Sequence, residues 1–222
     1  MQNMFSYCYS ITSLDLTLFN TNQVRSMSKM FMGCTKLEKL NLDIFNTEQV
    51  SDMTYMFQNC NSLTSLSINS FNTKKVTKMN YMFSNCNKLS SININNFDTS
   101  SVNDMSMMFQ GCSSLINLDL SHFNTQNVNN MNSMFSGCEK LEELYIDNFN
   151  TIKVKNMKMM FNKLINLRYL NLSSFITVNC NNYEKIFDEC YNLTIRIHRY
   201  KCFNILSGLP KYINVEYSNS NY

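Results

Sequence analysis

Apolar residues recur along this chain at a fixed interval of 26 residues, with mostly polar residues between them. One column consists of phenylalanines, at Phe19, Phe45, Phe71, Phe97, Phe123, Phe149 and Phe175. Another consists of valines, at Val24, Val50, Val76, Val102, Val128 and Val154. A fixed period of this length indicates a solenoid, in which each unit packs against the units before and after it.

Sulfur-containing residues follow the same period. Methionines form two columns, Met27, Met53, Met79, Met105, Met131 and Met157, and Met4, Met30, Met56, Met82, Met108, Met134 and Met160. Phenylalanines from Phe5 to Phe187 accompany the second methionine column. Cysteines form a further column at Cys8, Cys34, Cys60, Cys86, Cys112 and Cys138, which Leu164 interrupts and Cys190 resumes. Stacking would turn each column into a ladder of equivalent side chains.

Six apolar positions of one unit lie within an arc of about 140° when they are plotted at 100° per residue. They are Val50, Met53, Met56, Phe57, Cys60 and Leu63. This spacing predicts a helix of about three turns, with Thr47 as its N-cap and Asn61 at its end. Leu66 and Ile68 then alternate with polar residues, which predicts a short strand with one buried side.

These elements predict an α/β solenoid of 26-residue helix–turn–strand units with a parallel sheet. Residues 1–193 would hold about seven units, the first incomplete because Met4, Phe5 and Cys8 occupy the second half of a helix. Residues 194–217 would form a C-terminal cap, with strands in TIRIHRY and YINVEY and a short helix in KCFNILSGL. Residues 218–222 are expected to be a frayed tail. The uncapped N-terminal end offers a surface for self-association.

Composition and charge exclude several classes of protein. The net charge of +3 is small and the basic residues are scattered, so no nucleic acid is expected as a partner. The chain has no apolar run of 18 residues and no basic segment followed by an apolar one at its start. We therefore expect neither direct membrane insertion nor a secretory signal in this chain.

The cysteine and methionine columns fit core packing better than a metal or redox site. Metal ligands group around one point, often as C-x₂-C, and no such spacing occurs among the nine cysteines. A disulfide between stacked cysteines would need Cβ atoms closer than the distance between coils allows. Only Cys180 and Cys202, outside the regular column, are candidates for special thiols. No metal or other cofactor is expected.

A column of amides follows the phenylalanines, at Asn20, Asn46, Asn72, Asp98, Asn124 and Asn150. These side chains are expected to bond backbone groups of the loops that no regular ladder satisfies. The alternative is a Ca²⁺ site, which would need several carboxylates, and Asp98 supplies the only one in the column.

The unit FNTxxVxxMxxMFxxCxxLxxLxL resembles the BspA-like leucine-rich-repeat proteins, a family of surface proteins, over residues 4–193. Leu63, Leu66 and Ile68 correspond to its L-x-x-L-x-L core. The resemblance implies a right-handed leucine-rich-repeat superhelix and a role in adhesion or protein binding at the cell surface. It implies no catalytic residues in the repeats. The missing export signal departs from the family.

The outward positions of the predicted strands form a broad surface that changes along the chain. Its first half is small and polar, whereas its later part gains tyrosines, which are enriched at binding surfaces. The candidate partner-binding residues are Glu143, Tyr145, Tyr169, Asn171, Asn117 and Asp119. An ordinary solvated sheet face is the alternative interpretation.

Three hypotheses of function follow. The first is a non-enzymatic binding or adhesion module, at the cell surface or outside the cell, for a protein or a host or cell-surface ligand. The second is a cytoplasmic scaffold or self-assembling protein, which the absent signal and the free cysteines favour. An enzyme is the third, with His198 and Cys202 as its nearest candidate pair. We expect no catalytic activity.

Overall fold

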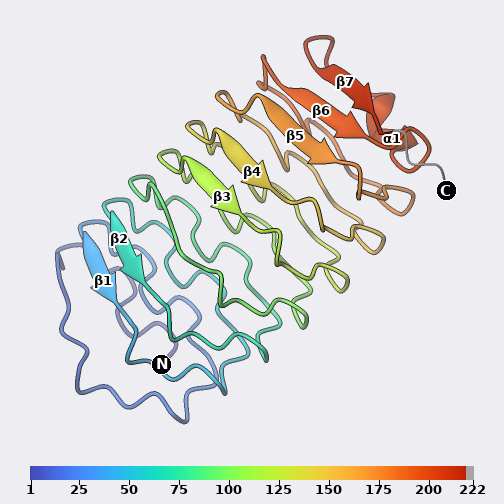
Figure 1. The fold of residues 1–222 in the computed structure, drawn as a ribbon. Helices are drawn as coiled ribbons and strands as arrows, with labels where there is room; N and C mark the ends of the chain where they lie inside the picture. The colour runs from blue at the N-terminus through green and yellow to red at the C-terminus, as the bar shows by residue number, and fades with distance from the viewer. Residues whose placement is uncertain (219–222) are drawn as a thin grey trace.

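The computed structural model describes residues 1–218 as a solenoid whose coils stack along one axis (Figure 1). Short strands line one side of this stack in chain order, and β1 and β7 lie toward opposite ends of it. The strands are β1 (Lys39–Asn41), β2 (Ser65–Ser67), β3 (Asn117–Asp119), β4 (Glu143–Tyr145), β5 (Tyr169–Leu172), β6 (Thr194–Ile197) and β7 (Asn214–Tyr217). The described helix is α1 (Phe203–Leu206), which lies between β6 and β7 in the chain.

The strands pair in parallel, as the sequence predicts. In the pair of β1 and β2, Leu40 lies opposite Leu66, which is the partner that the 26-residue period requires. In the pair of β3 and β4, Leu118 lies opposite Leu144. The third sheet consists of β5, β6 and β7. Hydrogen bonding is therefore divided among three short sheets instead of running through one sheet.

The predicted three-turn helices are wrong. The segment 50–63 contains no helix and forms consecutive tight turns. In the first, the amide of Met56 donates to the carbonyl of Met53 over 3.2 Å. The third residue of that turn, Tyr55, has a φ of 59°. A left-handed third residue is the mark of a type II turn. A second turn of the same kind ends at Cys60.

Hydrogen bonding between coils explains why turns replace the helix. A helix would use these amides internally, each donating to the carbonyl four residues earlier. Here alternate amides of one coil donate to carbonyls of the next: Met53 to Lys78 over 3.2 Å, Tyr55 to Asn80 over 3.1 Å, and Phe57 to Met82 over 2.9 Å. This ladder binds the coils together on the side opposite the strands. If these segments were helices, their amides would not be available for hydrogen bonds between coils.

Buried threonines make a second link between coils. Thr21, Thr47, Thr73, Thr99, Thr125, Thr151 and Thr177 are each 2% exposed or less. The Thr99 hydroxyl donates to the carbonyl of Asn124 over 3.0 Å and accepts the amide of the same residue over 2.8 Å. Thr47 bonds Asn72 in the same way. The prediction that Thr47 caps a helix is therefore wrong, because its hydroxyl satisfies two backbone groups of the next coil.

The amide column bonds loop backbone, as the sequence predicts. The side-chain oxygen of Asn46 accepts the amide of Glu48 over 3.0 Å. Asp98 accepts the amide of Ser100 over 2.9 Å. These are Asx turns, in which a short polar side chain takes the part of a backbone carbonyl. The column thus shapes each loop locally.

The methionine, phenylalanine and cysteine columns form the core, which confirms the packing interpretation of the sulfur. The phenylalanine column is fully buried from Phe31 to Phe187, and neighbouring rings such as Phe83 and Phe109 stack with centroids 5.5 Å apart. The Cys112 thiol donates to the Phe83 carbonyl over 3.2 Å. All nine cysteines are free. The buried thiols of the cysteine column donate hydrogen bonds to backbone carbonyls, as the Cys112 thiol does.

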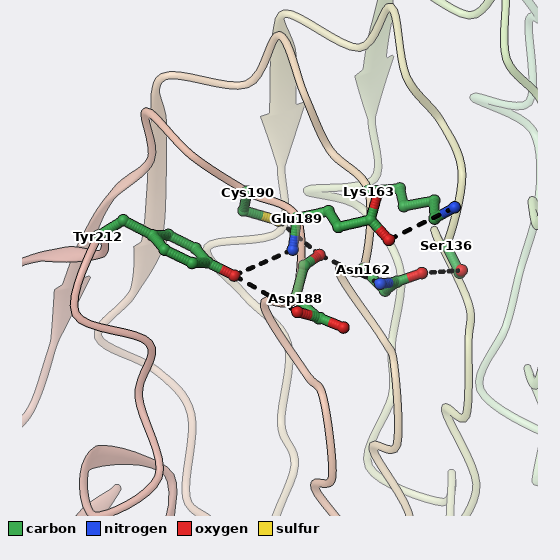
Figure 2. Close-up of polar contacts among 7 residues, drawn as sticks. All are labelled: Ser136, Asn162, Lys163, Asp188, Glu189, Cys190 and Tyr212. Carbon is green, nitrogen blue, oxygen red and sulfur yellow. Dashed lines mark hydrogen bonds and ion pairs between the residues drawn. The ribbon is translucent and has the colours of Figure 1, made fainter.

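The strands β6 and β7 and the helix α1 occupy the segments in which the sequence predicts them. Close to them, the Tyr212 hydroxyl accepts the amide of Glu189 over 3.0 Å (Figure 2). One coil earlier, the amide of Lys163 donates instead to the carbonyl of Asp188 over 2.8 Å. Tyr212 therefore takes the place of a carbonyl from a further coil. Apart from Ser218, the predicted tail lies outside the described residues.

The first coil continues the same hydrogen-bond ladder, but its core side chains are less buried than those of the later coils. The amide of Phe5 donates to the carbonyl of Met30 over 2.9 Å. The side chains of Phe5 and Cys8 are only partly buried, whereas those of Phe31 and Cys34, one coil later, are fully buried. The N-terminal end of the stack therefore shows core side chains partly to solvent.

Candidate functional site

Alternation along β4 and β5 places the predicted site residues on the outer side of the sheet. In β4, Glu143 and Tyr145 are exposed while Leu144 between them is buried. In β5, Tyr169 is exposed and Leu170 is buried. Tyr145 and Tyr169 each keep 45% of their surface exposed. Two large aromatic side chains are thus partly exposed to solvent on the outer face and do not belong to the buried core.

The strand register brings four of the candidates together. Asn117 of β3 lies opposite Glu143 of β4, and Asp119 lies opposite Tyr145. Neighbouring strands are about 4.8 Å apart, so these side chains lie within reach of one another. Asn171 lies two residues after Tyr169 in β5. The predicted residues therefore occupy one continuous area of the sheet face.

A shallow depression of about 310 Å³ lies between β4 and β5. Its lining residues are Glu142, Glu143, Leu144, Tyr145, Asp147, Tyr169 and Asn171. Four of the six predicted residues belong to this lining, whereas Asn117 and Asp119 lie on the neighbouring strand β3. We refer to the seven lining residues as the tyrosine depression.

Sequence reasoning missed Glu142 and Asp147. Both lie just beyond the ends of β4, so a count of outward strand positions leaves them out. The alternation itself contains the signal for Asp147, which follows Tyr145 by two residues and continues the outward series. In the folded chain, Asp147 accepts a hydrogen bond from the side-chain amide of Asn171, which holds the loop after β4 against β5.

Carboxylates dominate the electrostatics of the tyrosine depression. Hydrogen bonding to Glu143 and the charge of Glu143 raise the pKa of the Tyr145 phenol above its ordinary value, followed by desolvation and the charges of Asp119 and Asp147. Hydrogen bonds from the hydroxyl and amide of Ser121 lower the pKa of Asp119. At neutral pH the phenol is therefore neutral and Asp119 is charged.

The N-terminal half of the sheet face differs from the tyrosine depression. Its polar side chains bond one another: Ser67 donates to Asp43 over 2.6 Å, and Asn93 donates to Asn69 over 3.0 Å. The bond from Asn171 to Asp147 in the tyrosine depression is the equivalent contact. The half-exposed rings of Tyr145 and Tyr169 are therefore what distinguishes the depression.

The two candidate thiols that the sequence raised are buried. The Cys202 thiol donates to the Phe175 carbonyl over 3.1 Å, and burial raises its pKa to about 12. The thiol of Cys180 is likewise buried, and burial raises its pKa. Within residues 1–218, no group of three or more potential metal-ligating side chains is found. No helix in that range is long and apolar enough to cross a membrane.

Comparison with known families places the whole repeat region in one of them. The family described as "Mycoplasma protein of unknown function, DUF285" matches residues 1–117 and 114–207. The chain belongs to this family. The two matches together cover the chain from its first coil to α1, so the family corresponds to the repeat architecture and not to one segment of it. No curated protein matches the chain.

Proposed function

We propose that the protein is a non-enzymatic binding module that holds a protein partner on the outer face of its sheet, at the tyrosine depression. The observation that supports this most directly is the pair Tyr145 and Tyr169, both 45% exposed at the edge of one depression. Tyrosine is favoured at interfaces because it combines a large rigid surface with a hydroxyl group.

The cellular role that we propose is adhesion or recognition at a cell surface or outside the cell. The repeat unit FNTxxVxxMxxMFxxCxxLxxLxL resembles the BspA-like leucine-rich-repeat proteins, and that resemblance supports a surface role. A solenoid also suits this role, because its repeated coils present an extended surface to a partner. The partner would be a protein or a host or cell-surface ligand.

Replacing both tyrosines tests the proposed surface. Peptides would first be selected from a displayed random library against the wild-type protein. The variant Tyr145→Ser/Tyr169→Ser is expected to bind the selected peptides at least tenfold more weakly by fluorescence anisotropy. Its midpoint of thermal unfolding should stay within about 2 °C of wild type, because exposed side chains contribute little to stability.

A matched control removes two exposed tyrosines elsewhere. Tyr9 is 56% exposed and Tyr200 is 85% exposed, and neither lines the tyrosine depression. The variant Tyr9→Ser/Tyr200→Ser should keep wild-type affinity. If the depression variant binds the selected peptides as well as this control does, the partner surface lies elsewhere.

Self-assembly is a second candidate function, and the N-terminal coil favours it. Met4, Tyr7 and Tyr9 are 49%, 53% and 56% exposed at that end of the stack. A scaffold would associate through this end, inside the cell. Light scattering over a range of concentrations discriminates between the two candidates, because a strict monomer at high concentration contradicts self-assembly. Fractionation of cells separates a surface location from a cytoplasmic one.

A further inference from the structure

The charged side chains that line the tyrosine depression carry one sign of charge. Glu142, Glu143 and Asp147 line it, and Asp119 faces it from β3. No lysine or arginine belongs to the lining. The whole protein has a net charge of +3, so this acidic area is a local departure from the charge of the molecule. A cationic partner would be attracted here and not to the protein in general.

Two arginines lie beside the depression, on its C-terminal flank. Arg168 directly precedes β5, and Arg196 of β6 lies opposite Asn171. Both are therefore on the C-terminal side of the depression, away from Asp119 and β3. The acidic groups over β3 and β4 have no basic residue among the lining to neutralise them. A cation that enters the depression is consequently drawn toward β4.

The two tyrosines add a preference for the kind of cation. A guanidinium stacks on an aromatic ring and bonds carboxylates through two parallel N–H groups, whereas an ammonium acts as a point charge. The chain contains such a contact near its C-terminal end, where the guanidinium of Arg199 lies 4.2 Å from the centroid of the Tyr217 ring. Tyr145 and Tyr169 present two half-exposed rings beside carboxylates, which is the combination that arginine uses most fully.

We propose that the tyrosine depression binds an arginine-rich polypeptide segment, with its guanidinium groups over Tyr145 and Tyr169 and their N–H groups paired with Glu143 and Asp147. This inference rests on the proposed function and names the chemistry of its partner. The raised pKa of Tyr145 agrees with it, since the same carboxylates that would hold the guanidinium keep the phenol protonated. Because attraction between exposed charges is screened by ions, binding should weaken as salt increases.

Fluorescein-labelled nona-arginine, nona-lysine and nona-glutamate serve as probes, with anisotropy as the readout. The wild-type protein is expected to bind nona-arginine more tightly than nona-lysine and to leave nona-glutamate unbound. Affinity for nona-arginine should fall at least tenfold in the variant Glu143→Gln/Asp147→Asn. It should also fall at least tenfold when the salt concentration rises from about 50 mM to about 300 mM.

Two further variants separate this site from general electrostatic attraction. Glu48→Gln/Glu139→Gln changes the net charge by the same two units at exposed positions outside the lining, and should bind nona-arginine as wild type does. Tyr145→Phe/Tyr169→Phe keeps both rings and should keep most of the affinity, whereas the serine variant should lose it. Retained binding in the serine variant would contradict the stacking.

Several results would overturn the inference. Equal affinity of wild type and Glu143→Gln/Asp147→Asn for nona-arginine would show that these carboxylates do not bind the guanidinium groups. A wild-type protein that fails to bind nona-arginine at all would also overturn the inference. Library-selected peptides that need both tyrosines but lack arginine would overturn the inference and leave the proposed function standing. Selected peptides that ignore both tyrosines would contradict the proposed function itself.

Discussion

Raising the pH above 9 is expected to destabilise the protein steeply, because its buried thiols can ionise only when it unfolds. Burial is the main cause that raises the pKa of eight cysteines: Cys34, Cys60, Cys86, Cys112, Cys138, Cys180, Cys190 and Cys202. In Cys34 and Cys190 the pKa rises from an ordinary value of 9.0 to about 11, and in Cys112 to about 12. The unfolded chain therefore releases thiol protons first.

The sign and size of this effect follow from linkage. The stability that neutral thiols contribute is complete below pH 9 and is lost as the pH rises toward the folded-state pKa values. One pH unit above the unfolded pKa, each thiol with a large shift costs about 1.4 kcal/mol, so the seven other than Cys180 would cost on the order of 10 kcal/mol. That is comparable with the whole free energy of unfolding of an ordinary domain, about 5–15 kcal/mol.

Urea unfolding of the reduced protein at a series of pH values from about 7 to 10 gives the free energy of unfolding at each pH, and the slope of that free energy against pH measures the decline. The variant Cys60→Ala/Cys86→Ala/Cys112→Ala lacks three of the ionising groups but keeps every tyrosine and lysine. It should start less stable at pH 7, because it has lost packing, and should decline less steeply above pH 9. Identical slopes for the two proteins would show that the thiols are not the source of the alkaline sensitivity.

Replacing Thr99 with valine is expected to lower the free energy of unfolding by about 2–4 kcal/mol. Valine has nearly the shape of threonine, so packing is kept while the hydroxyl that bonds Asn124 is lost. An amide and a carbonyl then lose their partner, and a buried polar group without one costs about 1–3 kcal/mol. Urea unfolding at neutral pH provides the measurement.

The variant Thr99→Ser is the matched control for this substitution. Serine keeps the hydroxyl and removes one methyl group, which should cost about 1 kcal/mol. The account therefore requires valine to be the more damaging replacement, although it is the closer match in volume. If serine proves equally or more damaging, the methyl group matters more than the bonds between coils.

The 26-residue period was sufficient to predict the solenoid and the identity of its core. Stacking depends only on which side chains share a column, so Phe57 and Cys60 could be assigned to the interior without knowledge of the backbone between them. The same argument predicted the parallel pairing of β1 with β2 and of β3 with β4.

The backbone of each unit could not be derived from that pattern. Tight turns place their first and fourth residues inside, which gives intervals of three residues, and six positions do not separate this spacing from the 3.6 residues of a helix. One signal pointed to turns. Gly33, Gly111 and Gly137, three of the four glycines, share a column with Asn59, and all four residues have positive φ values. A helix interior would not collect glycine and asparagine at one position.

The candidate site was predictable to the extent that it lies on strands. Period-two alternation gives Tyr145 and Tyr169 as outward positions, and the 26-residue period places Tyr169 one coil after Glu143 on the same face. Glu142 and Asp147 lie beyond the ends of β4, so a count of strand positions leaves them out, although Asp147 continues the outward alternation of Tyr145. Loop residues therefore became part of the site only through the three-dimensional arrangement.

Thiol labelling of the native protein at neutral pH is the most direct test of the stacked, buried columns. Cys8 is partly exposed and should react first with a thiol reagent, as mass spectrometry of the labelled peptides would show. Cys60, Cys86 and Cys112 have no exposed surface and should react only as fast as the protein unfolds. Rapid labelling of those three cysteines in the folded protein would contradict the stacking on which the fold and the site depend.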